Sequence, residues 1–192
     1  MANLTNQELA FFSRLFKSNQ QQEILLDSKN SLTQGLPDTL SYLLSNAKLT
    51  LLAEIGIYQL WFPVVFVSDK RGQLTPIFSS PEVIDTKGIE RSWRSSELNL
   101  KSDNFVISSL SSSGVVLQPT SHTLPIQSLI TLHFQLPKQQ QVIMQVEPVR
   151  ITHSGIAAKI KVIEQGKEAL TSYLFDTHKQ FYPKLYRQQQ PC

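Results

Sequence analysis

The sequence predicts a mostly β fold, in which a six-stranded antiparallel barrel with a C-terminal helix follows N-terminal helices and a β-hairpin. Three observations predict it. Short segments of β character, separated by turn residues, succeed one another between residues 97 and 163. Apolar residues return at helical spacing over residues 164–182, and an earlier amphipathic stripe lies near the start of the chain. The 192 residues suffice for one large domain or two small ones.

The first predicted helix covers residues 4–26 and opens with a capping box, in which Thr5 is followed by Glu8. A second, shorter helix is predicted over residues 34–48. The first helix has one apolar stripe, made of Leu9, Phe12, Leu15 and Phe16. Such a stripe either packs on the protein's own domain, which we favour, or forms a docking face for a partner.

A period-two pattern begins near residue 48 and predicts a hairpin. Its strands lie in residues 48–63 and 64–78, joined near Pro63, and the chain turns back at residues 69–72. The segment 79–96 has no long periodicity, so we interpret it as a connector.

These patterns divide the chain into an N-terminal helical and hairpin region (1–86), a barrel domain with its C-terminal helix (87–180) and a polar tail (181–192). We expect the N-terminal region to pack on the barrel through its aromatic residues, namely Phe12, Phe16, Trp61 and Phe62.

Six segments supply the strands of the predicted barrel: residues 97–100, 104–111, 114–119, 128–136, 141–152 and 156–163. Strands this short, with turn residues between them, are typical of a small antiparallel barrel or sandwich. The following helix has Leu170, Tyr173 or Leu174, and Phe181 on one side. We expect that side to cover one mouth or edge of the barrel.

Composition excludes several classes of protein. The net charge is +3 and no dense block of Lys and Arg occurs, which argues against a non-specific nucleic-acid binder. Cys192 is the only cysteine, so we expect neither a disulfide nor a metal site. The sequence shows no signal-peptide pattern and no apolar run long enough for a membrane span, which predicts a cytoplasmic protein without membrane insertion.

Catalysis finds no support in the sequence. It lacks paired carboxylates, a nucleophile beside a histidine and a glycine-rich phosphate loop before a helix, so we expect neither an enzyme nor a catalytic residue. The four histidines are expected on the surface or on strand faces: His122, His133, His153 and His178.

A pair of arginines and a serine-glycine segment are the candidate ligand-binding residues: Arg91, Arg94, Ser109, Ser111 and Gly114. A guanidinium group presents a planar fork that fits guanine O6 and N7 or phosphate oxygens. Two serines two positions apart on a strand point to the same face and offer hydroxyl groups. Glycine permits a turn conformation closed to other residues, or a close backbone approach.

Simpler interpretations stay open for the same residues. The arginines can be solvated or paired with Glu90 and Glu97, and a serine run before glycine is often an ordinary turn. We interpret Trp93 as a packing anchor, with stacking on a base as the alternative.

The order of these features resembles the PilZ domain family, in which an arginine motif on a leading loop is followed by Asp or Asn, any residue, Ser, two residues and Gly. A six-stranded barrel and a C-terminal helix complete that pattern. The resemblance covers residues 88–180. Here the arginines are separated by two residues instead of three, and Ser109 replaces the acidic or amide residue, while Ser111 and Gly114 keep their spacing.

The resemblance implies a receptor for cyclic di-GMP, a bacterial second messenger, which couples ligand binding to a protein partner in motility, adhesion or biofilm control. It implies no cofactor besides that ligand and no nucleic-acid partner. One alternative is a degenerate PilZ domain that binds no nucleotide and acts as a protein-interaction module. A single-stranded nucleic-acid binder is a weaker alternative, because the chain has little excess basic charge.

Overall fold

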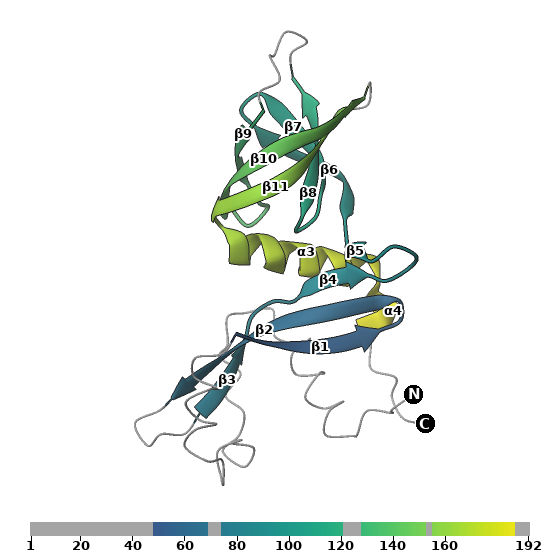
Figure 1. Ribbon diagram of the computed structural model, residues 1–192, viewed down its shortest axis with the longest axis vertical. Helices are drawn as coiled ribbons and strands as arrows, with labels where there is room; N and C mark the ends of the chain where they lie inside the picture. Colours follow the sequence, from purple (N-terminus) through teal and green to yellow (C-terminus); the bar gives the residue numbers. More distant parts are fainter. Residues whose placement is uncertain (1–47, 69–73, 121–127, 153–154, 187–192) are drawn as a thin grey trace. The chain divides into compact units, whose positions relative to one another are not determined.

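The computed structural model describes residues 48–68, 74–120, 128–152 and 155–186. Within them it contains a five-stranded sheet, a closed six-stranded antiparallel barrel and a C-terminal helix, which confirms the predicted fold class for this part of the chain (Figure 1). The two predicted N-terminal helices and the last residues of the polar tail lie outside the described residues.

The five-stranded sheet is built around the long strand β2 (Tyr58–Ser68). Its neighbours in the chain are β1 (Leu49–Ile55) and β3 (Leu74–Phe78). The first half of β2 pairs with β4 (Glu82–Asp85), and its second half pairs with β3. A two-residue strand, β5 (Arg91–Ser92), pairs with β4 and completes the sheet.

Two details of this region correct the sequence prediction. The chain turns at Gly56, whose φ is 61°, and β2 then runs through Pro63 without a break. A positive φ suits glycine and makes a tight turn, whereas the φ of proline is compatible with an extended strand. The segment that we interpreted as a connector also contains β4 and β5, which were too short to show a period.

The predicted packing through Trp61 and Phe62 holds only for Phe62. Phe62 is buried and its ring centroid lies 6.4 Å from that of Phe175, whereas Trp61 is 42% exposed. Consecutive residues on a strand point to opposite faces, so both cannot face the same neighbour. Phe12 and Phe16 lie outside the described residues.

The barrel has the closed strand order β10-β11-β8-β7-β6-β9. Its strands match the six predicted segments: β6 (Ser95–Ser102), β7 (Phe105–Leu110), β8 (Gly114–Pro119), β9 (Ile130–Gln135), β10 (Gln141–Thr152) and β11 (Gly155–Gln165). The circle closes where Ser102 pairs with Phe134. Register shifts in three of the strand pairs allow the strands to bend, as closure requires.

Alternating residues of these strands fill the interior of the barrel. The pattern is strict in β9, where every second residue is buried and the residues between them are exposed. The buried side chains include Ile107, Leu110, Leu117, Leu132, Phe134, Val142, Met144 and Ile156. The barrel therefore has its own apolar core. Burying such side chains stabilises the fold by roughly 1.5–3 kcal/mol each.

The helix α3 (Lys167–Phe181) follows the last strand, crosses one end of the barrel and contacts β4, β6 and β10 (Figure 1). Its buried side chains are Leu170, Leu174, Phe175 and His178. Phe181, which we expected on the same side, is 60% exposed, but its ring centroid lies 6.2 Å from that of Trp93. The short helix α4 (Pro183–Tyr186) follows. No helix in the described part of the chain is long and apolar enough to cross a membrane.

His178 lies inside the protein on a helix, which corrects the expectation of a position on the surface or on a strand face. Its side chain is fully buried, and its ring meets the edges of Tyr58 and Trp93 at centroid distances of 4.4 and 4.9 Å. Burial lowers the pKa of His178 to about 4, although the charge of Asp85 acts in the opposite direction. The histidine is therefore neutral at pH 7.

One compact unit comprises residues 52–62 and 80–181, and therefore holds the barrel, α3, β4 and β5 together. All candidate ligand-binding residues belong to this unit. The division of the chain between residues 86 and 87 stays a prediction.

Candidate functional site

Arg94 lies just before β6, and its guanidinium group reaches the serine segment of β7 and the turn that follows. Its Nη1 donates a hydrogen bond to Ser109 Oγ at 3.2 Å, and its Nη2 donates one to Ser111 Oγ at 3.4 Å. The sequence-predicted residues Arg94, Ser109 and Ser111 therefore come together, although 15 and 17 positions separate the arginine from the serines.

The serines are held by the β7–β8 turn. Ser109 is on β7, while Ser111 begins the turn and is almost fully buried. Ser111 Oγ donates to the carbonyl of Gly114 at 3.1 Å and accepts from the Gly114 N–H at 3.0 Å. These bonds fix the Ser111 hydroxyl group in place before any ligand arrives.

Gly114 makes room for the arginine. Two reasons for a glycine were expected here, a special turn conformation and a close approach of other atoms to the backbone. The φ of Gly114 is outside the left-handed range, so the close approach is the reason that applies. A Cβ at this position would lie 3.0 Å from Arg94 Nη2 and 3.1 Å from the carbonyl oxygen of Ala158. A larger residue would require the guanidinium group and the Ala158 carbonyl to move by a few tenths of an ångström.

Arg91, the fifth predicted residue, lies apart from the serines. It is opposite Asp85 in the β4–β5 pair, and its Nη2 is 3.9 Å from Asp85 Oδ2. Its side chain is 74% exposed, so this ion pair is weak. Asp85, not the sequence neighbour Glu90, is thus the partner of Arg91.

The two arginines still influence each other. Burial, and then the positive charge of Arg91, lowers the pKa of Arg94. Arginine keeps its charge at neutral pH nonetheless. Two cations that repel each other beside exposed surface favour the binding of an anion, because a ligand's negative charge would relieve the repulsion.

Glu82 is a residue of this region that the sequence did not reveal. It is the first residue of β4, and its Oε1 accepts hydrogen bonds from Ser112 Oγ and, at 3.0 Å, from Ser92 Oγ. Ser112 follows Ser111 in the turn, so a carboxylate and a guanidinium group both bind the same turn. No sequence pattern pointed to Glu82, because it lies 30 positions from Ser112 in a segment without periodicity.

Trp93 anchors the arginine-bearing segment. Its side chain is buried, it packs edge-on against His178, and its backbone N–H donates to the Val83 carbonyl at 2.8 Å. The packing interpretation therefore fits its position. A ring enclosed in this way has no open face for stacking on a base.

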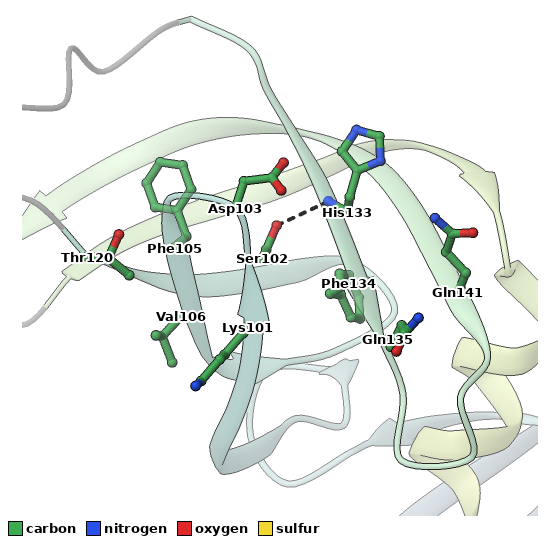
Figure 2. A pocket seen from close by; sticks show the side chains of 10 residues that line it. All are labelled: Lys101, Ser102, Asp103, Phe105, Val106, Thr120, His133, Phe134, Gln135 and Gln141. Atoms are coloured by element: carbon green, nitrogen blue, oxygen red, sulfur yellow. Dashed lines mark hydrogen bonds between the residues drawn. The ribbon is translucent and has the colours of Figure 1, made fainter.

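A second polar surface lies at the other end of β6, on the outside of the barrel (Figure 2). It is an open groove of about 640 Å³ beside the pair that closes the barrel. Its lining includes Lys101, Ser102, Asp103, Phe105, His133, Gln135 and Gln141. The backbone N–H of His133 donates to Ser102 Oγ at 3.1 Å (Figure 2). The groove offers one ammonium group and no guanidinium group.

Comparison with known proteins gives little further guidance. No family model matches the chain, and no curated protein matches it. Among solved structures, it is similar to the Bacillus subtilis inhibitor of motility (MotI/DgrA), with 14% sequence identity and a TM-score of 0.38. The match covers 64% of this chain and 67% of that one.

Proposed function

We propose that this protein is a cyclic di-GMP receptor whose ligand binds around Arg94 and the β7–β8 turn. The single observation that carries the proposal is the contact of the Arg94 guanidinium group with Ser109 and Ser111, beside a glycine that makes room for it. These are residues of the pattern that resembles PilZ domains, and they lie on a barrel of the predicted strand count.

The chemistry of the site suits this ligand. A guanidinium group has five N–H donors, and the two serines use two of them, which leaves donors for a phosphate or for guanine O6 and N7. Arg94 is only partly buried, and in this proposal the flat face of its guanidinium group stacks on a purine. A lysine would supply the charge without the plane or the fork.

Arg91 supplies a second positive charge in this proposal. Its ion pair with Asp85 is long and largely exposed, so it contributes at most about 1 kcal/mol. A ligand phosphate therefore competes easily for the guanidinium group. Movement of Arg91 from Asp85 to the ligand would change the β4–β5 surface, and a protein partner would recognise the change. As in the resemblance, that partner belongs to motility, adhesion or biofilm control.

Calorimetric titration of the full chain with cyclic di-GMP tests the proposal. We expect saturable heat for the wild type, and an affinity about tenfold to a hundredfold lower for Arg94→Ala, since charge-assisted bidentate hydrogen bonds are lost. Lys101→Ala, in the groove at the other end of β6, is the matched control and should bind as the wild type does. A wild type without heat rejects the proposal.

The second candidate is an interaction module that binds no nucleotide. Two observations favour it: Ser109 stands where the family pattern has Asp or Asn, and Arg91 is paired with Asp85. In that case Arg94 serves only to hold the turn. Titration separates the candidates, because this module gives no heat with cyclic di-GMP and Ser109→Asp creates none.

A further inference from the structure

Glu82 and Arg94 hold the β7–β8 turn from two sides. Arg94 donates to Ser111, and the adjacent Ser112 donates to Glu82 Oε1. Ser92, two positions before Arg94, donates to the same oxygen at 3.0 Å. The two charged groups form no ion pair with each other in the described part of the chain. An anionic and a cationic group are thus fixed around one turn by hydroxyl groups that lie between them.

The carboxylate keeps capacity for another donor. Among the described residues, both serine hydroxyl groups use Oε1, which leaves Oε2 for further hydrogen bonds. Glu82 is half-buried, and the crevice that it lines with Val83, Trp93 and Leu174 measures only about 10 Å³. That crevice has room for about one water molecule, so a planar base that contacts Glu82 must lie outside the crevice.

Guanine requires both kinds of group. Its O6 and N7 accept hydrogen bonds, which an arginine fork supplies, and its N1–H and amino group donate them, which a carboxylate accepts. Adenine has no N1–H and presents a different arrangement of donors and acceptors. A carboxylate beside an arginine therefore distinguishes guanine from adenine, whereas an arginine and hydroxyl groups alone do so less well.

We propose that Glu82 is the specificity-determining carboxylate of this site, which reads the N1–H and amino group of guanine while Arg94 binds O6, N7 or a phosphate. It supplies from β4 the acceptor that Ser109 cannot provide on β7. This inference rests on the proposed function, because it assigns a residue to the same ligand.

Glu82→Gln is a sharp test, because the amide oxygen still accepts from Ser92 and Ser112 while the carboxylate is lost. We expect the affinity for cyclic di-GMP, measured by calorimetry, to fall about tenfold. The affinity for cyclic di-AMP should stay unchanged, so the preference for guanine shrinks by the same factor. Glu147→Gln, an exposed carboxylate paired with Lys161, is the matched control and should change neither affinity.

The outcomes separate this inference from the proposed function. A wild type that binds cyclic di-GMP, with a Glu82→Gln variant of equal affinity and equal preference for guanine, overturns the role of Glu82 and leaves the receptor in place. A wild type that binds no cyclic di-GMP overturns both. Thermal unfolding of Glu82→Gln close to that of the wild type shows that a loss of affinity comes from recognition and not from an altered fold.

Discussion

The two ends of strand β6 carry polar residues, yet they differ in how those residues are held. At the first end, the guanidinium group of Arg94 is fixed by two serine hydroxyl groups and by the space that Gly114 leaves. At the other end, most side chains that line the groove around Lys101 and His133 are exposed. The hydrogen bond from His133 to Ser102 there comes from the backbone N–H and does not fix the histidine side chain.

This difference explains why the groove is the weaker candidate for a ligand site, although it has the larger volume. Side chains that are already in position lose little conformational freedom on binding, whereas long exposed ones must be ordered by the ligand. In the serine-glycine turn and its arginine, this conformational freedom is already lost when the protein folds. The groove of about 640 Å³ has volume but no such arrangement.

The largest expected effect concerns His178, which packs against Trp93, the residue before Arg94. The folded pKa of His178 is about 4 and the unfolded value is about 6.5. The contribution of the neutral histidine is thus fully present above pH 6.5 and is lost as pH falls towards 4. At 1.36 kcal/mol per pKa unit the loss reaches on the order of 3 kcal/mol. Urea unfolding measured between pH 4 and 7.5 should show this decline.

His178→Phe keeps a ring against Trp93 and should remove that part of the pH dependence. His133→Gln, in the groove, is the control. If His178→Phe loses stability between pH 6.5 and 4 as steeply as the wild type, the buried histidine is not the cause.

A substitution at Ser109 tests whether the first end reads guanine or only attracts anions. Ser109→Asp restores the acceptor of the family pattern, and we expect cyclic di-GMP to bind up to about tenfold more tightly. A purely electrostatic anion site would be weakened by the same carboxylate. Calorimetry gives the sign directly, and a weaker complex contradicts guanine reading at this position.

Much of this architecture follows from the sequence because β strands with one buried face have a strict period of two. The six barrel strands were predictable for that reason, and the approximate extent of α3 was predictable from apolar residues at helical spacing. The burial of His178 was predictable in principle, because it continues the i, i+4 row of Leu170 and Leu174. We expected it on the surface or on a strand face.

The candidate site was only partly predictable for a different reason. Arg94, Ser109 and Ser111 were predictable because their order in the chain resembles the PilZ pattern. Glu82 and Asp85 reach the site through β4, whose pairing with β2 and β5 depends on contacts between segments far apart in the chain. A strand of four residues has too little length to reveal its faces by periodicity.

Two serines of β6 should respond to alanine in opposite directions. Ser95 is buried and its hydroxyl has no hydrogen-bond partner in the described residues, so Ser95→Ala should raise the free energy of unfolding by about 1 kcal/mol. Ser102 accepts from the His133 N–H, so Ser102→Ala should lower it by about 1 kcal/mol. Urea unfolding measures both, and equal signs would contradict the assignment of satisfied and unsatisfied hydroxyl groups.

The smallest effect is expected at Arg91, where the two arginines can be compared directly. Arg91→Lys preserves the charge opposite Asp85 but removes the planar fork, so cyclic di-GMP should bind about threefold more weakly at unchanged stability. Arg94→Lys should weaken binding more, because Arg94 uses its fork to hold Ser109 and Ser111 while it contacts the ligand. Calorimetric titration of both variants ranks the arginines. A larger loss at Arg91 would mean that the ligand is centred on the β4–β5 pair and not on the serine turn.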